Sequence, residues 1–191
     1  MSNSSSRGFG LRPIGKVGQN RDAQGLTEYT VSDSPTIIYF QDPVKAISGG
    51  TIAVAAAGET LLGSLNGSFY TDPTTQKPTW RNYVPSVAAS DIVAFVSDDP
   101  YERFEIKSNN SGASAQADVF GNANIVYAAG DSANYVSNVK LNDSTLDTTN
   151  TLQLRIVGKG TDAQNNDIAS SNVNWVVKIN NHFLVQTTGL L

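Results

Sequence analysis

Short runs of apolar residues, rich in β-branched and aromatic side chains, recur from Leu26 onward and are separated by Gly, Pro, Asn and Asp. Such runs, with turn-forming residues between them, are typical of strands in an all-β domain. They predict strands at residues 26–31, 36–40, 51–55, 62–70, 92–96, 103–107, 124–127, 136–141, 151–157, 172–179 and 182–186. We therefore expect a mainly β protein, with a single antiparallel β-barrel or β-sandwich domain.

Alternation of apolar and polar residues is clearest in residues 151–157. Leu152, Leu154 and Ile156 fall on one face of the expected strand, and Gln153 and Arg155 fall on the other. Because side chains alternate along a strand, this pattern predicts one face against the core and one in water.

Turn-forming pairs mark the ends of several of these strands. Asn180-Asn181 lies between two apolar runs and predicts a two-residue hairpin, because Asn accepts the positive φ that such a turn requires. Asp72-Pro73 and Asp99-Pro100 predict turns, since Pro fixes φ and disfavours a helical predecessor. The small polar residues at 108–117 predict a loop.

Residues 1–25 differ from the rest of the chain. Their apolar residues stand singly among Ser, Gly and Asn, with no strand or helix period, which predicts an extended N-terminal arm before a β domain at 26–191. The arm carries a net charge of +3 and the remainder −7. We expect it to bind an acidic partner through its cations and apolar side chains, the alternative being a merely solvated terminus. These candidate binding residues are Arg7, Phe9, Leu11, Arg12, Ile14, Lys16 and Arg21.

Composition narrows the class of protein. The 191 residues are 39% hydrophobic, and no apolar run approaches the about 18 residues needed to span a bilayer. The N-terminal residues lack the apolar centre of a secretory signal, so synthesis in a cytoplasm is expected. With no Cys, neither disulfides nor thiol chemistry is available. The acidic body disfavours nucleic acid as a partner.

Residues that could carry chemistry form no persuasive catalytic pattern. His182, the single histidine, has no Gly-x-Ser-x-Gly motif to serve, so a structural strand histidine is favoured. Acidic clusters at 98–102 and 162–167 lack EF-hand spacing and are typical of solvated turns. Trp80, Tyr83 and Tyr101 could form a platform for sugars, although a Trp at the end of a loop more often covers the edge of a core. We expect no enzyme, no cofactor and no metal site.

Several segments recur in a characteristic order along nearly the whole chain after the arm: GLTEYT (25–30), DPV (42–44), LGSL (62–65), YTD (70–72), DIVAFVSDDP (91–100), FEI (104–106), TLQLRIV (151–157) and NWVVKINNHFL (174–184). In these segments and their order the chain resembles a family of tailed-bacteriophage head proteins, the structural or decoration (capsid cement) proteins of the virion. The family has no catalytic residues to transfer.

What the resemblance implies is a decoration protein that binds the outer surface of the assembled head and stabilises contacts between subunits of the major capsid protein. It also implies location on the virion exterior and self-association on the capsid as a dimer or trimer. Two alternatives stay open: another virion structural role, such as a head–tail joint, tail or fibre base, and a carbohydrate-binding module for host attachment. An enzyme such as a glycan depolymerase has the least support.

Overall fold

The computed structural model describes residues 3, 7–17, 25–32 and 35–190. Within them the chain is mainly β and its strand ladders are antiparallel, which confirms the predicted fold class, with the strands in a sandwich-like arrangement of sheets. Short 3₁₀ turns, η1 (Gln116–Asp118), η2 (Asp143–Thr145) and η3 (Phe183–Val185), are the described helical elements. None of the described helices is long and apolar enough to cross a membrane.

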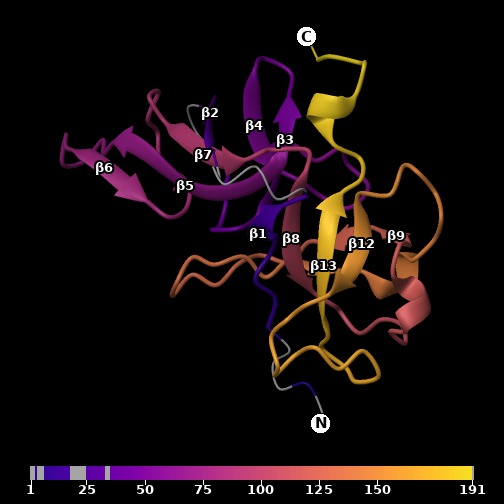
Figure 1. Ribbon diagram of the computed structural model, residues 1–191. Helices are drawn as coiled ribbons and strands as arrows, with labels where there is room; N and C mark the ends of the chain where they lie inside the picture. The colour runs from indigo at the N-terminus through magenta and orange to yellow at the C-terminus, as the bar shows by residue number, and fades with distance from the viewer. Residues whose placement is uncertain (1–2, 4–6, 18–24, 33–34, 191) are drawn as a thin grey trace.

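A six-stranded sheet lies at the upper left of Figure 1. Its order is β2 (Thr27–Thr30), β7 (Val93–Ser97), β5 (Gly63–Thr71), β3 (Pro43–Ile47) and β4 (Thr51–Val54), and β6 (Pro78–Arg81) also pairs with β5. A bridge between Val31 and Ile52 brings the β2 and β4 ends of the sheet together, so the sheet is strongly curled. Its concave face encloses one hydrophobic core, which includes Val44, Leu65 and Val96.

A five-stranded sheet lies beside it, at the lower right (Figure 1). Its order is β1 (Arg12–Lys16), β8 (Glu102–Lys107), β13 (Asn174–Ile179), β12 (Leu154–Lys159) and β9 (Asn122–Ala123), with a separate pair formed by β10 (Ile125–Val126) and β11 (Lys140–Leu141). The turn at 98–101 carries the chain from β7 in one sheet to β8 in the other. A second core, centred on Trp175 and Phe104, fills the inner face of this sheet.

The described part of the N-terminal segment is built into the domain, which differs from the extended arm expected of residues 1–25. Residues 12–16 form β1, an edge strand paired with β8, and Leu11 is fully buried in the second core. The Leu11 N–H donates to the Gln41 carbonyl (2.9 Å), and the Leu11 carbonyl accepts from Ser64 Oγ (2.6 Å). The segment therefore contacts both sheets, and its scattered apolar residues gave no period because only one of them enters the core.

Gly8 and Gly10 allow the backbone of the N-terminal segment to pass close to Gln41 and Asn138. Gly10 has φ +76°, and a Cβ there would lie 2.0 Å from the Gln41 carbonyl oxygen; a Cβ on Gly8 would lie 2.5 Å from the Asn138 oxygen. The backbone at 8–10 thus runs through a gap too narrow for any side chain at these two positions.

The strand predicted at 182–186 and the hairpin that should precede it do not form. The hairpin predicted at Asn180-Asn181 is wrong: residues 183–185 form η3, and β13 pairs instead with β12 and β8. Neither Asn has a positive φ. The Asn180 amide instead donates to the carbonyls of Asn150 and Leu152, both at 2.9 Å, so this pair caps a neighbouring loop rather than forming a turn.

The structure also differs from the sequence-based expectations at Gln153 and in the strands at 36–40 and 78–81. Gln153, predicted to face water, is fully buried: its Nε2 donates to the carbonyls of Ala56 and Glu59, both at 2.8 Å. Residues 36–40 form only isolated bridges, at Ile38 and Phe40. Residues 78–81, for which the sequence predicted no strand, pair with β5 as β6. The turns at 72–73 and 99–100 are confirmed.

We predict that Gly10→Ala destabilises the domain by about 3 kcal/mol, from the left-handed backbone together with a steric clash. Gly49→Ala is the matched control, because Gly49 has φ +88° but no atom within 4 Å of the position that a Cβ would occupy, so it should cost about 1 kcal/mol from backbone strain alone. Urea denaturation measures both, and equal losses would contradict the close passage.

Candidate functional site

The cations of the expected arm form ion pairs within the chain. Arg7 contacts Asp131 (2.8 Å), Lys16 contacts Asp99 (2.7 Å), and Arg12 contacts Glu105. Arg21 lies outside the described residues. In the docked conformation these three side chains hold the N-terminal segment to its own domain, so they are not free to recruit a partner in the way that an extended arm would.

The apolar side chains of the segment divide into two groups. Leu11 is fully buried, and Phe9 is half-buried with the Arg12 guanidinium 4.9 Å from its ring centroid. Ile14 is 44% exposed and Val17 is 50% exposed. Ile14 and Val17 therefore offer the larger apolar surface to another molecule while the segment stays docked.

These two exposed residues border a groove on the outer face of the five-stranded sheet. The groove measures about 620 Å³ and is lined from four adjacent strands or their ends by Ile14, Val17, Arg103, Glu105, Val157, Gly158, Lys159, Thr161 and Val176. Its lining combines four aliphatic side chains with cations. An accessible surface of this composition is typical of a protein-binding site, which has an apolar centre and a polar rim.

His182 has a structural role. It is buried, its Nδ1 accepts from the Leu184 N–H (3.1 Å), and no Ser or Thr hydroxyl in the described part of the chain hydrogen-bonds to its ring. Burial lowers the pKa of His182, which keeps the imidazole neutral at pH 7. This geometry caps η3 and provides no activated nucleophile.

The acidic cluster at 98–102 fastens β1 and β2 to the turn between the sheets. The Asp98 oxygens accept from Thr27 Oγ1 (2.9 Å) and Tyr29 Oη (2.6 Å). Glu102, almost fully buried, accepts from the Gly15 N–H (3.1 Å), and burial raises its pKa. These carboxylates contact backbone and hydroxyl donors rather than converging on a shared position.

The second acidic cluster closes its own loop. Asp162 accepts from the Gln164 N–H (3.0 Å), and Asp167 accepts from the Ala169 N–H (3.1 Å) and Ser170 Oγ (2.8 Å). Across the described residues, no three His, Cys, Asp or Glu side chains form a group that could hold a metal ion.

The structure does not assemble the three aromatic residues of the alternative sugar-binding hypothesis into one exposed platform. Tyr83 is buried and stacks on Tyr135, with ring centroids 3.8 Å apart. Trp80 does not cover a core edge: it is 59% exposed on β6, and a Cβ on Gly67 would lie 2.9 Å from its Cζ2. The indole therefore rests against the Gly67 backbone. Tyr101, 53% exposed, belongs to the separate turn between the two sheets.

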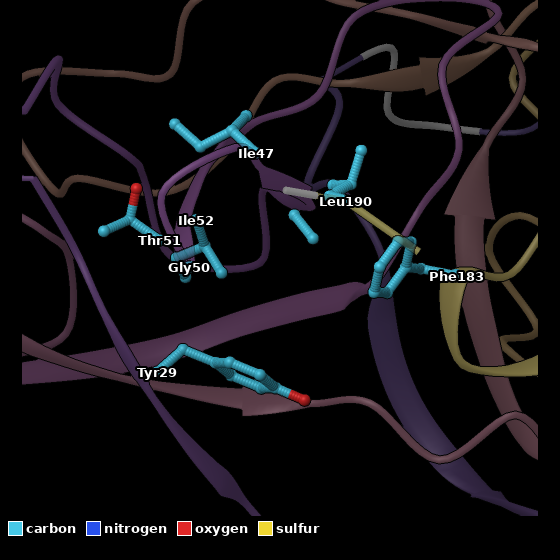
Figure 2. A pocket seen from close by; sticks show the side chains of 8 residues that line it. Tyr29, Ile47, Gly50, Thr51, Ile52, Phe183 and Leu190 are labelled. Atoms are coloured by element: carbon cyan, nitrogen blue, oxygen red, sulfur yellow. The ribbon is translucent and has the colours of Figure 1, made fainter. Parts of the chain in front are cut away.

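An apolar pocket lies between the six-stranded sheet and the C-terminal segment. Figure 2 shows Tyr29, Ile52, Phe183 and Leu190 around a common space. At about 240 Å³ it is smaller than the roughly 300–1,000 Å³ of typical ligand sites. The Tyr29 hydroxyl is already bonded to Asp98, so few polar groups remain to orient a ligand.

No family model, curated protein or solved structure matches this chain. The groove on the five-stranded sheet is thus identified from geometry alone. The sequence indicated Ile14 as a binding residue, but not Arg103, Val157, Lys159 or Val176, because their common face depends on the order β1-β8-β13-β12.

A buried carboxyl beside the N-terminal passage gives the stability of the domain a pH dependence. Asp42 is fully buried, and its Oδ1 has no hydrogen-bond partner among the described residues, whereas its Oδ2 accepts from the Tyr39 N–H (2.9 Å). Burial raises the pKa of Asp42 to about 6, although hydrogen bonds from Ser137 and Tyr39 act in the opposite direction. The native state therefore binds a proton more tightly than the unfolded state does. Ionised Asp42 destabilises the fold above pH 6, and this cost disappears as the pH falls toward 4.

We predict that Asp42→Asn raises the free energy of unfolding at pH 8 by about 2 to 3 kcal/mol, since one pKa unit corresponds to about 1.4 kcal/mol. The gain should shrink as the pH falls from 7 to 4, where the native carboxyl is itself neutral. Chemical denaturation across this range measures the difference between the two proteins. A difference that does not vary with pH would refute the role of Asp42.

Proposed function

We propose that this protein is a decoration protein of a bacteriophage head, which binds the outer surface of the assembled shell and stabilises contacts between major capsid protein subunits. The order of sequence segments supports the class. The groove on the five-stranded sheet supports a binding role, because it leaves aliphatic side chains and cations accessible on the outer face of the sheet. Self-association on the capsid remains part of the proposal.

The proposed mechanism is mass action. A protein that binds only the assembled shell shifts the equilibrium toward that shell, and many copies on a repeating lattice multiply the effect. The docked N-terminal segment changes the expected mode of contact: in this proposal the outer face of β1-β8-β13-β12, with Ile14 and Val17 at its border, replaces an extended arm as the main contact.

Binding to expanded phage heads that lack the protein tests this function. Uptake should saturate at on the order of hundreds of copies per head, as expected of a site repeated over the lattice. The melting temperature of the heads should rise, and an unrelated β protein of similar size and charge serves as control. Saturation at about a dozen copies would instead indicate a ring-shaped joint, and no uptake would contradict a role on the head.

A carbohydrate-binding role is the second candidate, and Trp80 is the observation that favours it. With one side of the indole against Gly67 and 59% of the residue exposed, the ring offers a flat surface on which a sugar can stack.

If this second role holds, Trp80→Ala should abolish binding to host surface polysaccharide and leave the melting temperature unchanged. Phe120→Ala is the control, because Phe120 is also exposed (77%) but precedes β9 of the other sheet. Glycan-array binding and calorimetry provide the two readouts. Equal binding by all three proteins would exclude Trp80 as a sugar platform.

A further inference from the structure

Three cations lie in a row across the outer face of the five-stranded sheet. Arg103 on β8 is the register partner of Lys178 on β13, and Lys178 is the register partner of Arg155 on β12. Cross-strand partners project from the same face. With strands about 4.8 Å apart, the row spans about 10 Å of the sheet.

The row faces away from the core, and among the residues that the structure describes no carboxylate forms an ion pair with it. The neighbouring residues Phe104, Val177 and Ile156 are fully buried on the opposite face. In the described part of the chain neither the Arg103 nor the Lys178 side chain forms a hydrogen bond or ion pair, and the Arg155 side chain donates to a neutral acceptor, Asn122 Oδ1 (2.9 Å).

Glu105, the acidic side chain in the adjacent groove, does not neutralise the positive charge of the row. Glu105 is nearly buried and is engaged by Arg12 and by the Asn174 amide (2.9 Å). Like charges directly opposite each other on neighbouring strands destabilise a sheet. The isolated domain therefore carries three cations whose arrangement favours an anionic partner rather than its own stability.

We propose that this cation row, together with the groove beside it, recognises a protein surface that presents carboxylates around an apolar ridge. The inference rests on the proposed function, because it names the partner chemistry of the same sheet face. Arg103 belongs to both features, and Val176 and Val157 each lie two residues from a cation of the row on the same strand.

The lining favours a protein over a nucleic acid. Ile14, Val17, Val157 and Val176 give an aliphatic surface that a phosphate backbone would not use, and Glu105 adds a carboxylate to the lining. The whole chain also has a net charge of −4. Charge complementarity then sets the orientation and rate of association, while burial of the aliphatic residues slows dissociation.

The test compares Lys178→Glu with Lys77→Glu, a matched charge reversal at an exposed residue beside β6. Each protein is titrated at low and high salt with a peptide that alternates Glu with Val and Leu, with poly-glutamate and with single-stranded DNA of equal charge. NMR shifts of the backbone amides locate the contact.

We expect the alternating peptide to shift Arg103, Arg155 and Lys178 and to bind more tightly than either other probe. Lys178→Glu should weaken this binding at least tenfold, yet raise the melting temperature, because it places an anion between two cations. Lys77→Glu should change neither property by a comparable amount, and high salt should weaken the wild-type interaction.

Unchanged peptide binding by Lys178→Glu, or no binding of the peptide to the wild type at low salt, would overturn the proposal. Tighter binding of DNA than of peptide would assign the row to nucleic acid instead. Equal uptake of wild-type and Lys178→Glu protein by phage heads would leave the proposed function standing and remove this site. Peptide binding at the row without uptake by heads would leave this site standing and contradict the proposed function.

Discussion

The narrow passage of residues 8–11 beside Gln41 and Asn138 is the constraint on which much of the architecture depends. Glycine at 8 and 10 lets the backbone approach its neighbours closely enough for Leu11 to enter the core of one sheet and bond to residues of the other. Once Leu11 is fixed, β1 follows at the edge of β8. The border of the outer groove is therefore set by the same few residues that connect the two sheets.

Polar groups reinforce this connection at a point where the sheets meet. The turn at 98–101 joins β7 to β8. Asp98 in this turn accepts from Thr27 and Tyr29, Asp99 pairs with Lys16, and Glu102 at the start of β8 accepts from the Gly15 backbone. Acidic residues that could have been read as chemistry thus stabilise the geometry of the domain. The groups to which we assign binding, the cation row and Trp80, lie instead on accessible faces of the two sheets.

The sequence predicted the class of fold well, because alternating apolar positions and Pro-containing turns are local signals. It failed where tertiary contacts decide the outcome: Gln153 is buried because it satisfies backbone groups from distant loops, and β6 forms because β5 extends alongside it. The cation row could not be predicted from the sequence for the same reason. Arg103, Arg155 and Lys178 are far apart in the chain, and only the strand register makes them neighbours.

The orientation of the protein on a phage head tests the account most directly. Cryo-electron microscopy of heads saturated with the purified protein should show ordered density in which the outer face of β1-β8-β13-β12 contacts the shell and the β5–β6 hairpin points away from it. Ordered density attached through that hairpin, or the absence of ordered density at any lattice position, would contradict it.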